Sequence, residues 1–292
     1  MNILIIGGGG VVGQKLAKAL AAKGTLRGTA ISRLTLADVV DPAPVDAPFP
    51  VETTRCDIAD AASVAQVVSK DTDVIYLLAA IVSAHAEEDF DAGMQINLFG
   101  TYNVLGDHSY PNPQTSYGGQ KAMGEILIND YSRKSFIDGR AFRLPTISVR
   151  PGKPNRAASS FMSSILREPL NGQTAICPVD GDFLHYYLSP RKCADNLVKA
   201  AELDGAAIGE NRAMQMPGKV WSIDQVIAAM TAVAGPAPAK LIRWEAQPEV
   251  QAIVSGWRWD IHADKAESLG LEADASFEDN IRYYLEDDKP TA

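Results

Sequence analysis

The sequence predicts an α/β fold built on a doubly wound parallel sheet, and three observations support that prediction. The chain opens with "NILIIG", an apolar run rich in Ile and Leu that is typical of a buried parallel strand. A glycine-rich turn leads into "VVGQKLAKALAAKG", where Val12, Leu16 and Leu20 have helical spacing. The later strand-like runs "RLTLADVVDP", "VETTRCDIAD" and "DVIYLLAA", with a helical segment at 61–70, continue the alternation of strand and helix.

The length, charge and cysteine content of the chain limit which kinds of protein it can be. The chain has 292 residues, 46% of them hydrophobic, which is enough for one large domain or two modest ones. Its net charge of −9 argues against binding nucleic acid or an anionic membrane through bulk charge. No apolar run reaches the ~18 residues of a membrane span, and the start lacks the basic stretch of a signal peptide. Cys56, Cys177 and Cys193 lie far apart, which favours a reducing compartment. We therefore expect a soluble cytoplasmic protein without a metal site.

A run of glycines separates the first strand from the first helix. Gly7 would permit the tight turn, Gly10 the approach of a pyrophosphate, and Gly13 the close packing of helix on strand. Gly8 with Gly10 and Gly13 fits a second, G-x-G-x-x-G spacing, so the run alone leaves two fingerprints open. Free N–H groups of the first helical turn would face the phosphates in both cases. The pattern predicts a Rossmann-type dinucleotide site, with phosphate-binding residues Gly7, Gly10, Val11, Val12 and Gly13.

The second strand predicts which dinucleotide binds. Asp38 lies near its C-terminal end, where a carboxylate accepts hydrogen bonds from the adenosine ribose hydroxyls and repels a 2′-phosphate. We therefore expect NAD rather than NADP, with Asp41 as the alternative carboxylate. The spacing from Gly7 exceeds the usual ~20 residues, and an inserted loop, "GTLRGTAIS", accounts for the excess.

The segment "TSYGGQK" contains Tyr117 and Lys121, four residues apart and therefore on one face of a helix. Such a pair is common and indicates little by itself. Here it follows the glycine turn, Asp57, Ala79 with Ala80, and Asn97 in "INLFGTYNVL". In that order the chain resembles the extended short-chain dehydrogenase/reductase (NAD-dependent epimerase/dehydratase) family, down to the late segment "DIHADKAESLGL".

The resemblance implies roles for these residues. Tyr117 would be the general acid/base, and the nearby ammonium of Lys121 would lower the pKa of its phenol and bind the nicotinamide ribose. Asp57 would contact adenine, and Asn97 would hold a helix kink and a proton-relay water. The remaining cofactor-facing positions implied are Ile58, Leu78, Ala79, Ala80, Pro145 and Thr146.

One element of the family pattern is missing from the sequence. A fifth strand with a substrate-orienting Ser or Thr normally precedes the tyrosine, but "LGDHSYPNPQTSYGG" contains no β-branched apolar run. Either residues are missing from the printed chain near Gly106–Asp107, which we favour, or the protein lacks this strand. No catalytic serine is assigned for this reason.

The second half of the chain predicts the substrate. Nucleotide-sugar epimerases usually carry a Tyr-Gly-Pro motif where this chain has "VRPGKPN". The segment "RLPTISVRPGKPNRAASSFMSSILREPLNGQ" is instead similar to the D-erythronate dehydrogenase branch, whose members oxidise the C2 hydroxyl of a short sugar acid with NAD. An arginine is the expected clamp for the substrate carboxylate, with Arg191 first and Arg143 and Arg150 behind it. We expect further substrate contacts from Ser83, Tyr117 and His185.

These expectations divide the chain. Residues 1–150 would form the NAD-binding Rossmann domain, with returns near 182–205 and 250–264, and 151–292 would form mainly a smaller C-terminal α/β substrate-binding domain. The resemblance also implies a homodimer through the helices that carry Asn97 and Tyr117. Three functions remain open: an NAD-dependent sugar-acid dehydrogenase, a nucleotide-sugar epimerase or dehydratase that retains NAD, and a non-catalytic NAD-binding protein.

Overall fold

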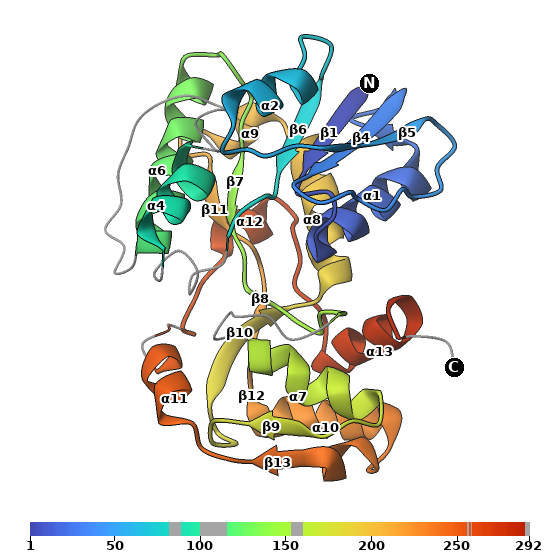
Figure 1. The fold of residues 1–292 in the computed structure, drawn as a ribbon, viewed down its shortest axis with the longest axis vertical. Coiled ribbons are helices and arrows are strands. Elements are labelled where there is room, and N and C mark those ends of the chain that lie inside the picture. Colours follow the sequence, from blue (N-terminus) through green and yellow to red (C-terminus); the bar gives the residue numbers. More distant parts are fainter. Residues whose placement is uncertain (82–88, 100–115, 153–159, 256, 258, 290–292) are drawn as a thin grey trace. The chain divides into compact units, whose positions relative to one another are not determined.

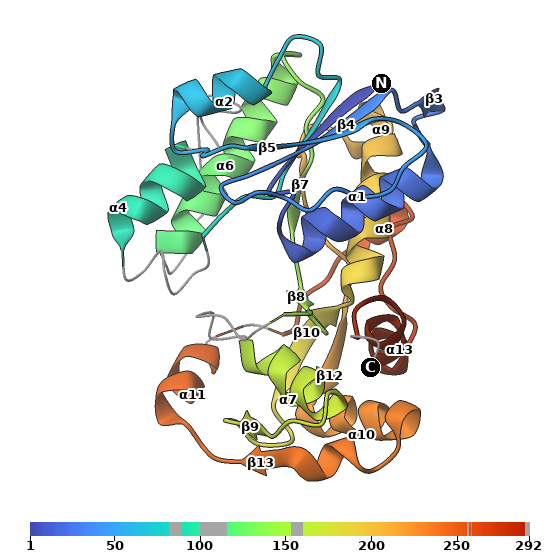
Figure 2. The ribbon, with the colours of Figure 1, turned by 45° about the vertical axis from the view of Figure 1, so that its right-hand side comes forward.

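The computed structural model covers the chain and describes all residues except 82–88, 100–115, 153–159, 256, 258 and 290–292. The chain forms two compact units (Figures 1 and 2). Unit 1 contains Met1–Phe142 and Ala194–Met214, and unit 2 contains Arg143–Cys193 and Gln215–Ala292. The predicted functional division near residue 150 stays a prediction, because compactness does not show which part holds a ligand.

Unit 1 alternates strands with helices along the chain, as the sequence predicts. Its first elements are β1 (Asn2–Ile6), α1 (Val11–Lys23), β2 (Thr25–Leu26), β3 (Thr29–Ala30), β4 (Arg33–Asp38), β5 (Val51–Arg55), α2 (Ala61–Val67) and β6 (Val74–Leu77). They are followed by α4 (Phe90–Gly93), the π-helix η1 (Met94–Phe99), α6 (Ser116–Arg133), β7 (Ala141–Arg143), α8 (Pro190–Glu202), α9 (Gly205–Ile208) and β11 (Ala213–Gln215).

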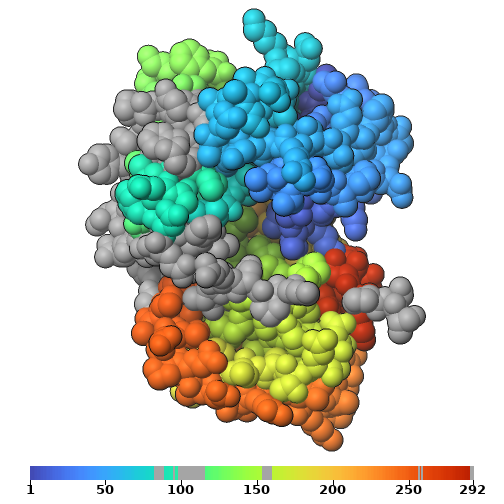
Figure 3. All heavy atoms as spheres, in the orientation of Figure 1, coloured from blue at the N-terminus to red at the C-terminus, as the bar shows by residue number. Residues whose placement is uncertain are grey.

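A parallel sheet in the order β5-β4-β1-β6 is the centre of unit 1. Its two inner strands are apolar, and Leu4, Ile6, Leu34 and Leu36 are almost fully buried. Burial on both faces explains why these strands read as continuous apolar runs. The predicted α/β class with a parallel sheet is confirmed. Helices α4 and α6 pack with η1 in the same unit, and Figure 3 shows the surface of α4 in teal.

Details of the predicted strands differ. The third and fourth strands end at Arg55 and Leu77, rather than at Asp57 and Ala80. The inserted loop is a hairpin of β2 and β3, whose turn residues Arg27 and Gly28 have φ of 52° and 72°. Two successive positive φ angles characterise the type I′ turn, which matches the twist of a two-residue hairpin.

The position of the expected fifth strand is an edge of the described sheet. A doubly wound sheet in the order 3-2-1-4-5-6 would place that strand beside β6. Within the described residues no strand pairs with the outer side of β6, and β7 pairs instead with β11 in a separate two-stranded sheet. The segment in which we looked for the strand, 100–115, lies outside the described residues. The choice between residues missing near Gly106–Asp107 and a protein that lacks this strand therefore stays a prediction.

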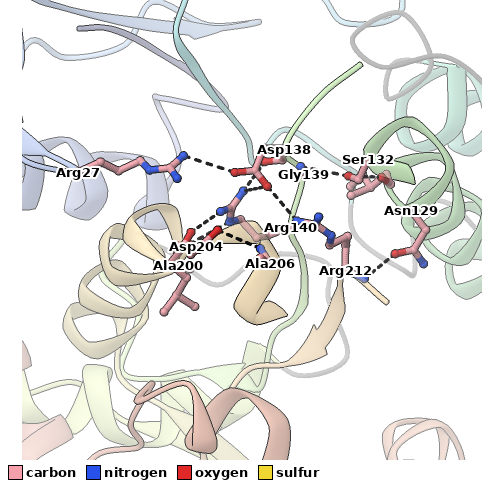
Figure 4. A network of polar contacts seen from close by, with 12 residues as sticks. Arg27, Asn129, Ser132, Asp138, Gly139, Arg140, Ala200, Asp204, Ala206 and Arg212 are labelled. Atoms are coloured by element: carbon pink, nitrogen blue, oxygen red, sulfur yellow. Dashed lines mark hydrogen bonds and ion pairs between the residues drawn. The ribbon is translucent and has the colours of Figure 1, made fainter. Parts of the chain in front are cut away.

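A single carboxylate joins three segments of unit 1 (Figure 4). Asp138 accepts ion pairs from Arg27 at 3.4 Å, Arg140 at 2.8 Å and Arg212 at 2.8 Å. Arg140 also donates from Nε to the Ala200 carbonyl at 3.1 Å. Burial raises the pKa of Asp138, but the hydrogen bonds and charges of Arg140 and Arg212 outweigh it and hold the pKa below its ordinary value. The late segment 194–214 is thereby fixed to the N-terminal part of its unit.

Unit 2 has a smaller α/β core. Strand β10 (Leu184–Leu188) lies between β8 (Thr146–Ile147), which is parallel to it, and β12 (Lys219–Ser222), which is antiparallel. A second, parallel pair joins β9 (Ala175–Cys177) to β13 (Ile242–Trp244). The helices are α7 (Phe161–Leu170), α10 (Ile223–Ala234), the 3₁₀ helix η3 (Pro238–Leu241), α11 (Pro248–Val254), α12 (Asp264–Ser268) and α13 (Phe277–Asp287). Their apolar faces enclose a core that includes Met162, Ile165, Tyr187, Met230 and Phe277.

Among the described helices of the two units, none has both the length and the apolar character of a membrane span.

The contact between the glycine turn and α1 generates a prediction. A Cβ at Gly13 would overlap the Gly7 carbonyl oxygen and lie 2.9 Å from the Gly8 Cα, and both obstacles are backbone. Gly13→Ala should therefore lower the melting temperature and abolish dinucleotide binding, because α1 must move off β1. A Cβ at Gly10 would meet nothing closer than 3.4 Å, so Gly10→Ala is the matched control and should melt near wild type in a thermal denaturation. Equal melting temperatures for the two variants would contradict this account.

Candidate active site

The turn between β1 and α1 presents backbone donors and almost no side chains. Gly7 adopts φ of 94°, and the N–H groups of Gly7 and Gly8 donate to the Ala37 carbonyl at 2.8 and 3.0 Å. Gly10 is the N-cap of α1 and supplies no side-chain acceptor to the first turn. The N-terminus of a helix can bind an anion through the N–H groups of its first turn and the positive end of its dipole. The arrangement is compatible with the pyrophosphate of a dinucleotide, and phosphate binding by Gly7, Gly10, Val11, Val12 and Gly13 stays a prediction.

Asp38 is the last residue of β4 and lies directly beside this turn. Its Oδ2 accepts the Gly9 N–H at 2.9 Å, so the carboxylate is held against the glycine loop. The alternative, Asp41, forms a two-bond pair with Arg55 at 2.9 and 2.8 Å, and both side chains are largely exposed. The geometry therefore favours Asp38 over Asp41 as the ribose-facing carboxylate.

The other positions predicted to face the cofactor lie at the C-terminal ends of β5 and β6. Asp57 is exposed and its Oδ1 accepts the Ala59 N–H at 2.9 Å, while Ile58 is buried. Leu78 and Ala79 donate their N–H groups to the Ile6 carbonyl at 2.7 and 3.0 Å. A Cβ on Gly7 would lie 2.6 Å from the Ala79 nitrogen. Only glycine allows so close an approach of the turn to the strand end. Ala80 is exposed beyond it, and ligands of such sheets bind at the C-terminal ends of the strands.

Tyr117 and Lys121 occupy the first turns of α6. The Lys121 ammonium lies over the phenol, with Nζ 5.8 Å from the ring centroid. The four-residue spacing thus brings the two side chains together, as the helical period requires. The structure places the predicted acid/base residue and its predicted cation in contact.

Burial dominates the protonation of both groups. It raises the pKa of the Tyr117 phenol and lowers the pKa of Lys121 to about 8. The expectation that Lys121 lowers the pKa of Tyr117 describes one electrostatic contribution. In this structure the loss of hydration is larger, because a desolvated site disfavours phenolate and ammonium alike.

Asn97 is almost fully buried in the π-helical segment η1. Its side chain bridges to one residue beyond β6: Oδ1 accepts the Ile81 N–H at 3.0 Å, and Nδ2 donates to the Ile81 carbonyl at 3.4 Å. A π-helical turn widens the helix locally and often occurs at functional sites. The side chain therefore fixes an irregular helix to the strand end, which is the kink-holding part of its predicted role.

Thr146 and His185 form a polar pair within unit 2 that the sequence did not predict. Thr146 Oγ1 lies 2.7 Å from His185 Nε2. Strands β8 and β10 pair Thr146 with Tyr187, and His185, two residues earlier, points to the same face. His185 is 7% exposed, and burial lowers its pKa to about 4. The imidazole is neutral at pH 7, and only strand register, which spacing along the chain does not reveal, brings it to Thr146.

The remaining substrate candidates differ in their surroundings. Arg191 donates to Asp287 and Glu286 of α13, and its guanidinium lies 4.1 Å from the Tyr283 ring centroid. These contacts disfavour its predicted role as a carboxylate clamp, because the guanidinium is already neutralised. Arg143 is exposed on β7, and Pro145 is buried. Ser83 lies outside the described residues.

Comparisons with known proteins agree with the site. Residues 3–106 match the model of the NAD dependent epimerase/dehydratase family. A D-erythronate dehydrogenase from Cupriavidus necator is 43% identical over 320 residues, covering 98% of each chain. A D-erythronate dehydrogenase from Haemophilus influenzae is 37% identical, covering 99% of this chain and all of the relative. Both alignments are longer than this chain, which therefore aligns with gaps of its own.

A solved structure, described as a nucleoside-diphosphate-sugar epimerase from Agrobacterium tumefaciens, is also similar. It is 39% identical, with a TM-score of 0.92, and the match covers 98% of this chain and 94% of that one. The identity to relatives over nearly the whole length, together with the glycine turn and the Tyr117–Lys121 pair, identifies the fold and the cofactor class. The chain belongs to the NAD-dependent epimerase/dehydratase family, and it is a dehydrogenase of the extended short-chain dehydrogenase/reductase type that uses an NAD-type cofactor.

Proposed function

We propose that this protein oxidises the C2 hydroxyl of a short sugar acid similar to D-erythronate, with NAD as the oxidant. The observation that carries the proposal is the pair of D-erythronate dehydrogenases at 43% and 37% identity over nearly the full length. The position of the Lys121 ammonium, 5.8 Å from the centroid of the Tyr117 ring, supports the proposal that this pair supplies the acid/base chemistry of such an oxidation. We further propose a cytoplasmic homodimer that associates through the helices that carry Asn97 and Tyr117, η1 and α6.

In the proposed mechanism, Tyr117 acts as a phenolate and accepts the proton of the substrate hydroxyl. NAD, which the glycine turn and Asp38 would hold, would supply the acceptor for the hydride of the carbon that carries this hydroxyl. Lys121 stabilises the phenolate by its positive charge, which matters because burial otherwise raises the pKa of Tyr117. Asn97 keeps the helix irregularity in place and passes the proton outward through water. Ser83, Arg143 and His185 remain proposed substrate contacts.

A second function has one specific observation in its favour. The similar solved structure is described as a nucleoside-diphosphate-sugar epimerase. An epimerase would use the same Tyr117 and the same cofactor but would retain the cofactor between turnovers. Net formation of NADH therefore distinguishes the two functions.

The substrate test follows from that distinction. Purified protein with NAD and D-erythronate should form NADH in equal amount to the oxidised product, and UDP-galactose or UDP-glucose should give no turnover. Tyr117→Phe should lower kcat by ~100-fold or more, the scale of acid/base catalysis, while leaving NAD binding nearly intact. Epimerisation without net NADH would favour the second function. Wild-type turnover by Tyr117→Phe would remove the proposed mechanism, and absence of any turnover would favour a non-catalytic NAD-binding protein.

The preference for NAD over NADP tests whether the Asp38 carboxylate faces the adenosine ribose. Asp38→Ser should raise the KM for NAD about tenfold or more, because a hydrogen bond to a charged group contributes ~1.5–3 kcal/mol, and should also remove the repulsion of NADP. The measurement is the ratio of kcat/KM for NAD to that for NADP, which should fall. Asp41→Ser is the control, and it should leave the ratio unchanged because Asp41 pairs with Arg55 at the surface. A fall in the ratio for Asp41→Ser alone would reverse the assignment.

Burial of Lys121 predicts a dependence of stability on pH. Its pKa is lowered from 10.5 to about 8 in the folded protein, so below pH 8 the folded state carries a desolvated charge. That cost disappears as pH rises from about 8 to 10.5, where the unfolded chain also loses the proton. Lys121→Met should therefore raise the melting temperature of the cofactor-free protein at pH 7, and the gain should shrink over that range. The exposed Lys134 supplies the control Lys134→Met. A gain that is constant with pH would contradict the assignment.

A further inference from the structure

One segment of this acidic chain carries only positive charge. From Arg143 to Arg167 the sequence contains no Asp or Glu, although the net charge of the chain is −9. The cations of the segment are Arg143, Arg150, Lys153, Arg156 and Arg167. The first acidic residue after this segment is Glu168, which pairs with Arg167, so any anion that neutralises the other cations must come from elsewhere in the chain, from solvent or from a ligand.

Arg150 occupies a fixed backbone position in this segment. It follows β8, its N–H donates to Ser163 Oγ at 3.2 Å, and its carbonyl accepts from Arg167 Nη1 at 2.9 Å. Both partners belong to α7, which packs into the core of unit 2. The Cα from which the guanidinium extends is thus held by the core of the unit.

The Arg150 guanidinium itself is unmatched. It is half-buried, and within the residues that the structure describes it has no hydrogen-bond or ion-pair partner. Its neighbour Arg167 is neutralised by Glu168 at 2.6 Å. Burial and the charge of Arg167 both lower the pKa of Arg150, so both disfavour its charged form. A desolvated cation beside a second cation destabilises the folded state unless an anion joins it.

We propose that Arg150 binds the carboxylate of the substrate and determines the preference for an acid over a neutral polyol. This inference rests on the proposed function. A guanidinium offers two parallel N–H donors that match the two oxygens of a carboxylate. Arg191, the first candidate by sequence, has its donors occupied by Asp287 and Glu286, whereas no side chain in the described part of the chain pairs with the guanidinium of Arg150.

The test compares Arg150→Met with a matched control. Met keeps the apolar stem and removes the charge. With D-erythronate, Arg150→Met should raise KM about 30- to 100-fold, the scale of a charge-assisted pair, and leave the KM for NAD unchanged. With D-erythronamide, in which a neutral amide replaces the carboxylate, wild type and variant should be alike. Arg150→Lys should recover part of the loss. Arg282→Met, on an exposed arginine paired with Asp279, should behave as wild type.

A stability measurement separates binding from a structural role. Because Arg150 is unmatched, Arg150→Met should melt at or above the temperature of wild type, whereas loss of a structural arginine lowers it. D-erythronate added with NAD should raise the melting temperature of wild type but not of Arg150→Met. An unchanged KM for D-erythronate, a rise in KM for NAD instead, or a lowered melting temperature would each overturn the role of Arg150.

The same measurements distinguish failure of this inference from failure of the proposed function. If wild type oxidises D-erythronate and Arg150→Met does so equally well, the function stands and the Arg150 assignment falls. If D-erythronate stabilises wild type through Arg150 without being oxidised, the result supports carboxylate binding by Arg150 and contradicts the proposed reaction. If D-erythronate neither binds nor reacts, both fall.

Discussion

The contact of α1 with β1 through the glycine turn is the constraint on which the rest of the cofactor site depends. Gly7 and Gly8 donate to the Ala37 carbonyl at the end of β4, and the Ile6 carbonyl accepts from Leu78 and Ala79 after β6. Three strand ends are therefore hydrogen-bonded around one turn. A side chain at Gly13 would strike the backbone of this turn and push α1 away from β1. Asp38 is beside the phosphate-binding loop because this packing holds it there.

Local patterns predicted the elements that depend on local physics. The strand, the glycine turn and α1 follow from apolar runs and from conformations that side chains exclude, and Tyr117 meets Lys121 because the helix repeats every 3.6 residues. Contacts between distant segments were not predictable in this way. The bond between Thr146 and His185 depends on the register of β8 and β10, and the neutralisation of Arg191 by α13 spans 95 residues or more. Sequence spacing carries no information about either.

Burial of the Tyr117–Lys121 pair has two opposing effects on its charges. A dry site strengthens the attraction between phenolate and ammonium, because the effective dielectric constant falls. The same dryness disfavours each charge separately, which is why the pKa of Tyr117 is raised and that of Lys121 is lowered to about 8. The charged pair is therefore favoured over two isolated charges, and Lys121 supports the phenolate only while it keeps its proton. In the proposed mechanism the protonation states of the two residues are therefore coupled.

Ion pairing distinguishes arginines with a structural role from an arginine that could bind a ligand. Several arginines form ion pairs with acidic side chains. The pairs are Arg55 with Asp41, Arg140 and Arg212 with Asp138, Arg167 with Glu168, and Arg191 with Asp287. The partly buried pairs return some of the free energy lost when the charges leave water, whereas the exposed Arg55–Asp41 pair contributes little. Arg150 has no such partner among the described residues, yet its backbone is held as firmly as theirs. A half-buried charge without such a partner costs free energy of folding, which supports the proposal that Arg150 binds an anionic ligand.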